Sequence, residues 1–167
     1  MGNNLTINSA AAKKLARWEP RLQDPAEDVR KAAVQAAIEV AGAGEPLASR
    51  ALDLLTMTLI NIKAAENSRD EVCSFIVDIM SIDEHALASS PKLIQELLTA
   101  PTGDPQAAQF LLSTLRRVVE GGHLLATSDV MSPIVDFAKS VAALPPKPGR
   151  ADALRILDWF EDSGTSP

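Results

Sequence analysis

The chain has 167 residues, of which 46% are apolar and 23% charged, so it is long enough for one globular domain with a sizeable core. The net charge of −6 disfavours a protein that wraps nucleic acid, because affinity for phosphates depends on clustered cations. The single cysteine, Cys73, excludes an internal disulfide framework and predicts an intracellular protein, cytoplasmic or, in a eukaryote, nuclear.

The spacing of apolar residues predicts an all-α chain. Apolar side chains recur at intervals of three and four residues between Pro and Gly breaks, without sustained strand alternation. The expected helices span 9–22, 25–41, 46–65, 69–81, 91–99, 105–120, a segment from Ser128 or Ser132, and 150–161. The most apolar of them, 46–65, is expected to be the central core helix. No stretch approaches the roughly 20 apolar residues that a membrane span needs.

These helices group into about four antiparallel pairs, which start near residues 9, 46, 91 and 129. A spacing of roughly 40 residues is typical of helical-repeat proteins, in which each pair buries its apolar face against the next. We therefore expect a single helical-repeat domain over 9–161, built as a short α-solenoid or bundle. Residues 1–8 are expected to be a flexible N-terminus and 162–167 a disordered tail.

The segment from Leu22 to Ala41 says most about the architecture. Asp24 is expected to cap its helix and Pro25 to take the first helical position, where a missing N–H costs nothing, and Asp104 repeats this device before Pro105. One face carries small apolar residues at helical spacing: Val29, Ala32, Ala33, Ala36, Ala37 and Val40. Such a face lets a neighbouring helix approach closely.

The pattern Leu22-x-Asp24-Pro25-x-x-x-Val29-Arg30-x-Ala32-Ala33 resembles the second helix of a HEAT repeat. The resemblance implies a HEAT- or armadillo-like helical-repeat protein. In HEAT arrays the Asp and the Arg often bond between adjacent repeats, so the resemblance implies structural roles for Asp24, Pro25, Val29, Arg30 and Ala33. The later helices lack the Val-Arg signature, which favours a degenerate array over a regular one.

Lys13, Arg17 and Arg21 recur every four residues, so they are expected to share one face of the first helix, with Lys14 beside them. Residues 1–31 carry a net charge of +2, whereas residues 32–167 carry −8. This stripe is either a solvated helix face or a docking edge for an acidic partner. Trp18, near the end of the same helix, is either a core plug between helices or a platform for a ligand.

Arg116 and Arg117 stand near the end of an otherwise apolar helix. They either complement the dipole of the helix C-terminus or bind an anionic group, since arginine makes bidentate contacts with carboxylates. We include both with the basic stripe as candidate partner-binding residues.

The sequence predicts no catalytic, cofactor-binding or metal-binding residues. The soft metal ligands Cys73, His85 and His123 are far apart, and neither a Gly-x-Ser-x-Gly elbow nor a phosphate-binding glycine loop is present. We therefore expect no enzyme but a protein–protein interaction module, scaffold or adaptor that binds a protein or peptide. Two alternatives stay open: a HEAT-like nucleic-acid-binding or DNA-repair protein that uses the basic stripe, and a chain that pairs with itself through the helix of Trp159 and Phe160.

Overall fold

A computed structural model describes residues 2–100, 104–122, 129–143 and 149–162, with side chains from Ser9 onward. All regular secondary structure in these ranges is helical, which confirms the predicted all-α class. Ser128, His123 and all but the first residue of the expected tail lie outside the described residues. The elements are α1 (Gly2–Trp18), the 3₁₀ helix η1 (Glu19–Gln23), α2 (Glu27–Ala41), α3 (Leu47–Ala64), α4 (Arg69–Ile79), α5 (Glu84–Ala88), α6 (Pro91–Leu98), α7 (Pro105–Glu120), α8 (Met131–Ala142) and α9 (Arg150–Asp162).

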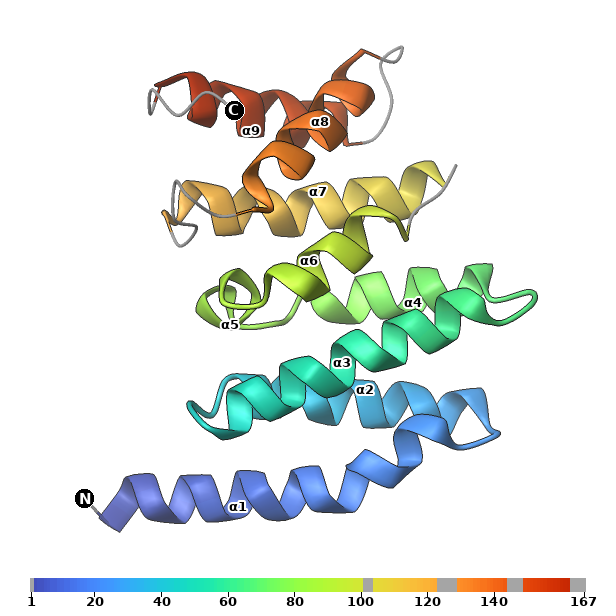
Figure 1. Cartoon of the computed structure of the whole chain (residues 1–167), viewed down its shortest axis with the longest axis vertical. Coiled ribbons are helices and arrows are strands. Elements are labelled where there is room, and N and C mark those ends of the chain that lie inside the picture. The colour runs from blue at the N-terminus through green and yellow to red at the C-terminus, as the bar shows by residue number, and fades with distance from the viewer. Residues whose placement is uncertain (1, 101–103, 123–128, 144–148, 163–167) are drawn as a thin grey trace.

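The helices lie in two layers, with α1 and α9 at opposite ends of the longest axis (Figure 1). α1, α3, α6 and α8 follow one another in the first layer, and α2, α4, α7 and α9 in the second. Contacts of α1 with α2, α2 with α3, α3 with α4 and α8 with α9 join the layers. The long helices run in alternating directions along the chain (Figure 1), and the short α5 packs against α3, α6 and α7.

The core lies between the layers and is built from aliphatic side chains. Leu55 and Leu59 of α3, Ile76 of α4 and Leu111 of α7 are fully buried in it. α3 contacts α1, α2, α4, α5 and α6, as expected of a central core helix, although Met57 is 53% exposed on its outer side. In the described part of the chain, no helix combines the length and apolarity needed to cross a bilayer.

The start of α2 differs from the prediction. The helix begins at Glu27 with Ala26 as its N-cap, so Asp24 and Pro25 precede it and do not cap it. The Asp24 side chain instead accepts a hydrogen bond from the backbone N–H of Ala26. The Asp24 backbone is extended, as favoured for a residue before proline. Asp-Pro suits such a turn as readily as a helix cap, which explains the wrong boundary.

Local sequence determines where α1 ends and where α7 begins. Its backbone is helical from Gly2, earlier than the predicted start at Ser9. It ends at Trp18, where the chain tightens into η1, because Pro20 supplies no N–H to continue the α-helix. The predicted cap of α7 is confirmed, since the Asp104 side chain accepts hydrogen bonds from the N–H groups of Gln106 and Ala107.

Polar side chains join each helix of the second layer to the next. Between α2 and α4, Arg30 donates from Nε and Nη2 to the two carboxylate oxygens of Glu71, at 2.7 and 3.1 Å. Between α4 and α7, the Cys73 thiol donates to Asp104 Oδ2 at 3.1 Å. The junction of α7 with α9 holds two ion pairs: Arg116–Asp152 and Arg155–Glu120.

Replacing Asp104 tests the cap of α7 and its dependence on pH. Hydrogen bonds from Cys73 and from the Ala107 N–H hold the pKa of Asp104 below its ordinary value. This carboxylate therefore contributes stability above the unfolded-state pKa of about 3.9, and the contribution is lost as the pH falls through the lower folded-state pKa. We expect Asp104→Ala to lower the free energy of unfolding at neutral pH by about 1 kcal/mol.

Urea denaturation followed by circular dichroism across the acid range measures both effects. Asp104→Asn keeps a capping side chain but does not titrate, so its deficit relative to the wild type should shrink in acid. Asp53→Asn, at an exposed position of α3, is the matched control and should leave the pH profile unchanged. A deficit of Asp104→Asn that stays constant down to low pH would contradict the assignment.

A double-mutant cycle on Arg30 and Glu71 measures the junction of α2 with α4. Their side chains are only 24% and 17% exposed and their contact is bidentate, so Arg30→Met and Glu71→Gln should show a coupling energy on the order of 1 kcal/mol. Lys14 and Glu39, which are 39% and 63% exposed, form a control pair for which we expect about 0.3 kcal/mol. Equal coupling energies for the two pairs would refute the stronger role of Arg30.

Candidate functional site

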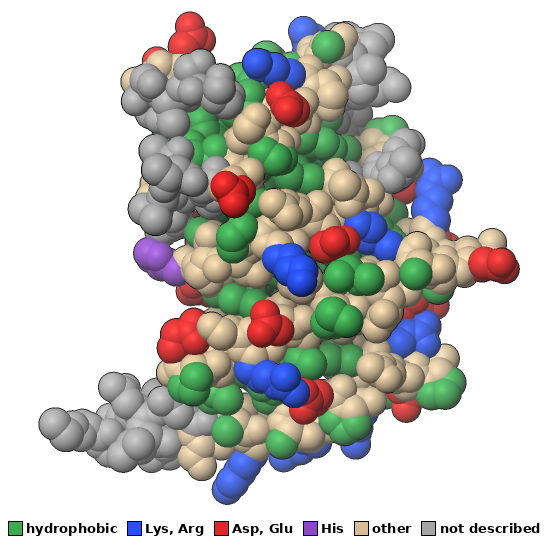
Figure 2. All heavy atoms as spheres, in the orientation of Figure 1, with side chains coloured by type: hydrophobic (Ala, Val, Ile, Leu, Met, Phe, Trp, Pro, Cys, Tyr) green, Lys and Arg blue, Asp and Glu red, His purple; other side chains and the backbone are tan. Residues whose placement is uncertain are grey.

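The basic edge, defined as Lys13, Lys14, Arg17 and Arg21, lies at the α1 end of the stack. Lys13 and Arg17 are exposed on the outer side of α1, and Figure 2 shows basic side chains along this lower margin. Among the described residues, neither of these two has an ion-pair or hydrogen-bond partner. Lys14 turns the other way and pairs with Glu39 of α2. Lys13 and Arg17 are therefore available to a partner.

Arg21 is positioned by a contact with Trp18 and not by the helical spacing that the sequence suggested. Because α1 ends at Trp18, Arg21 belongs to η1, and its guanidinium carbon lies 4.6 Å from the centre of the Trp18 ring. This is a cation–π contact, in which the ring face attracts the positive charge. Trp18 is half-buried and packs against the core, so it holds Arg21 at the end of the edge while part of the indole stays accessible.

The charge around the basic edge is one-sided. No acidic residue occurs between Ser9 and Trp18. Glu19 and Glu39 lie nearby, but Glu19 pairs with Arg50 and Glu39 with Lys14. The outer side of α1 therefore presents positive charge to solvent, and this field weakens beyond about 10 Å at moderate salt.

The structure places Arg116 and Arg117 away from the basic edge. Arg116 lies 3.1 Å from Asp152 of α9, through Nη1. Arg117 lies 3.4 Å from Glu84 and also donates to the backbone carbonyl of Met80. Both arginines thus make contacts within the chain, and their role in partner binding stays a prediction.

Arg30 ties the turn before α2 to α4. Its Nη1 donates to the backbone carbonyls of Asp24 and Pro25 at 2.8 and 2.9 Å, while Nε and Nη2 contact Glu71. The hydrogen bond with Glu71 outweighs the effect of burial and raises the pKa of Arg30. Of the other residues in the HEAT-like pattern, Ala33 is fully buried and Val29 half-buried.

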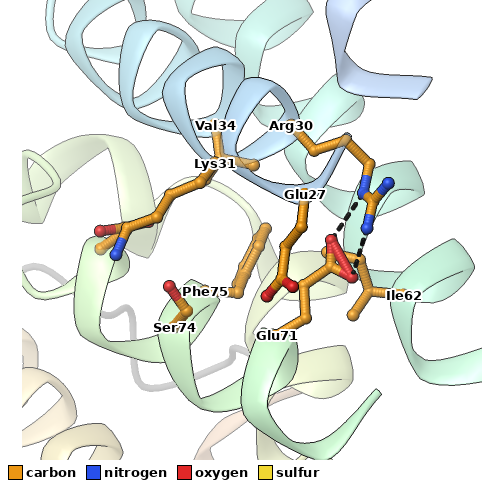
Figure 3. Close-up of a pocket in the computed structure, with 9 residues that line it drawn as sticks. Glu27, Arg30, Lys31, Val34, Ile62, Glu71, Ser74 and Phe75 are labelled. Carbon is orange, nitrogen blue, oxygen red and sulfur yellow. Dashed lines mark hydrogen bonds and ion pairs between the residues drawn. The ribbon is translucent and has the colours of Figure 1, made fainter. Parts of the chain in front are cut away.

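A small cavity lies between α2 and α4, beside the Arg30–Glu71 pair (Figure 3). Val34 and Phe75 contribute apolar surface to it, and Ser74 is among its polar lining. Its volume is about 20 Å³, which is room for about one water molecule. Sites for small organic ligands measure roughly 300–1,000 Å³, so this cavity does not fit such a ligand.

Cys73 is held as a protonated thiol. Burial, followed by the hydrogen bond to Asp104, raises the pKa of Cys73 to about 11. Because the thiolate is the reactive form, this side chain is a poor nucleophile and a poor metal ligand at neutral pH. Within residues 2–100, 104–122, 129–143 and 149–162, no three His, Cys, Asp or Glu side chains gather in a group able to hold a metal ion.

The sequence interpretation named the helix of Trp159 and Phe160 as a self-pairing surface, but not the residues exposed on the outer face of this helix, α9. Leu154 is 48% exposed there, and Asp158 and Glu161 are exposed on the same side. An open hollow of about 640 Å³ is lined in part by these three residues, and a second one of about 380 Å³ by Trp159. Phe160, by contrast, is buried. The spacing of 154, 158 and 161 is helical, so this face could have been found by searching for outward patterns.

Alkylation of Cys73 tests the environment of the thiol. With a pKa of about 11 rather than the ordinary value of about 8.5, the thiolate fraction at mildly basic pH is on the order of 100-fold smaller. We expect iodoacetamide to modify Cys73 correspondingly more slowly than glutathione, as measured by mass spectrometry. Asp104→Asn should speed the reaction, because it removes a negative charge beside the sulfur. Modification at the rate of a free thiol would contradict this assignment.

Comparisons with known proteins found no similar protein. No family model matches the chain, and no curated protein or solved structure matches it.

Proposed function

We propose that the chain is a protein–protein interaction module, a scaffold or adaptor of helical-repeat type, whose basic edge binds an acidic protein or peptide. The observation that carries this proposal is the exposure of Lys13 and Arg17 on one side of α1 without partners among the described residues. Arg21 extends the same edge above the Trp18 ring.

The architecture we propose is a short α-solenoid of four antiparallel helix pairs, similar to HEAT or armadillo proteins. The two-layer order supports it, because the first helix of each pair would belong to one layer and the second to the other. The polar junctions of α2 with α4, α4 with α7 and α7 with α9 would then be the contacts between successive pairs. Proteins built this way present long surfaces to partners.

The energetics favour a modest and salt-sensitive interaction. Each exposed ion pair contributes about 0.2–1 kcal/mol, so three cations alone supply on the order of 1–3 kcal/mol. The accessible part of Trp18 adds apolar contact, and aromatic residues often anchor protein interfaces. A partner is therefore expected to carry several carboxylates and at least one apolar side chain.

Binding of a labelled oligoglutamate peptide, followed by fluorescence anisotropy, tests this function. Arg17→Glu replaces an attraction by a repulsion, so we expect affinity to fall about fivefold, which corresponds to about 1 kcal/mol. Lys92→Glu changes the same charge at an exposed position of α6 and is the matched control, with affinity expected within about twofold of the wild type.

The same variants distinguish the proposed function from the alternative of nucleic-acid binding. If duplex DNA binds the wild type more tightly than the peptide does, and Arg17→Glu abolishes that binding, the nucleic-acid hypothesis replaces this one. If Arg17→Glu and Lys92→Glu weaken peptide binding equally, the basic edge is not the binding site.

A further inference from the structure

The two ends of the helix stack carry opposite charge. At the α1 end, the basic edge faces outward. At the α9 end, Asp158, Glu161 and Asp162 are exposed and outnumber Arg155, the exposed cation of that helix. Figure 2 shows basic side chains along the α1 margin, and both acidic and basic ones at the opposite extreme of the long axis. The ends are thus electrostatically complementary to each other.

Both end surfaces also expose apolar side chains among their charges. On α9, the half-exposed Leu154 lines an open hollow together with Asp158 and Glu161 and with two arginines, Arg116 and Arg155. On α1, the exposed Ala12 and Ala16 lie one helical turn apart on the side that carries Lys13 and Arg17. Small side chains let a second helix approach closely. Leu154 could therefore pack over the alanines while carboxylates meet the cations on either side.

The order of the layers continues across such a contact. α8 belongs to the first layer and α9 to the second, so the next helix in the alternation would belong to the first. α1 is the helix that begins the first layer. A second copy placed with α1 on α9 therefore extends both layers without a break.

We propose that the α9 end of one copy binds the basic edge of a second copy, so that chains associate head to tail. This inference rests on the proposed function, because it names a partner for the same basic edge. The two surfaces in contact are different, so the association is heterologous and forms open chains unless its rotation closes a ring. The charged contacts make it sensitive to salt.

Sedimentation velocity over a range of protein and salt concentrations tests the proposal. The mass of the wild type should rise with protein concentration beyond that of a dimer, and fall when salt is added. Arg17→Glu and Asp158→Lys should each be monomeric alone, with association weakened about tenfold or more. Lys92→Glu should assemble like the wild type, and far-UV circular dichroism should show that all variants are folded.

Mixing the two reversed variants provides the sharpest test. The Arg17→Glu copy keeps an intact α9 end, and the Asp158→Lys copy keeps an intact basic edge. Their mixture should associate again, because the intact α9 end of one copy binds the intact basic edge of the other, and the two reversed ends also carry opposite charges at positions 17 and 158. Leu154→Ser should weaken wild-type assembly without altering its net charge.

Several outcomes would overturn the inference: a wild type that stays monomeric, an assembly unaffected by either reversal, or a wild-type dimer that does not grow, which indicates a symmetric interface. The oligoglutamate assay separates this failure from that of the proposed function. If the wild type is monomeric but Arg17→Glu still weakens peptide binding, only the self-association is refuted and the proposed function stands. If Arg17→Glu changes neither peptide affinity nor assembly, both proposals are wrong.

Discussion

The fold depends on the close approach of α2 and α3, where the contact between the two layers is most extensive. Small side chains make this approach possible: Ala33 and Ala37 of α2 and Ala51 of α3 are all completely or almost completely buried. Packing a larger side chain into such a contact typically costs about 1–3 kcal/mol, because the helices must separate or the side chain must leave its preferred rotamer. Since α3 also contacts α4, α5 and α6, the separation would disturb the middle of the core.

Much of the secondary structure could be predicted from the sequence, because it follows from local chemistry. Apolar spacing placed the helices, and Asp104 with Pro105 marked the start of α7, whereas α1 ends at Trp18 and not at the expected residue 22. The α2 boundary was wrong because the same Asp-Pro pair also forms a turn, and only the surrounding chain decides between the two. Val34 and Ile38 were not included in the expected buried face, because α2 is enclosed by neighbours on several sides.

The candidate site was only partly predictable. The four-residue spacing of Lys13 and Arg17 was sufficient to place them on one face, since both lie within a single helix. The pairing of Lys14 with Glu39 depends on how α1 is rotated against α2, which a single sequence does not specify. The same holds for Arg30 and Glu71, whose partners are distant in the chain. The sequence named the helix of Trp159 and Phe160 for self-pairing, but it did not distinguish the exposed Leu154 from the buried Phe160.

The order of the contacts along the two layers determines which helices can unfold locally. α9 contacts mainly α7 and α8, whereas α1 contacts mainly α2, η1 and α3. Neither end is tied to the other, so the contacts are local in the sequence and the chain has a low contact order, which is typical of rapid folding. Backbone amides of α1 and α9 should open to hydrogen exchange without unfolding of the middle helices, whose side chains are enclosed on both sides. The surfaces proposed to bind partners thus lie on the helices that require the least free energy to unfold locally.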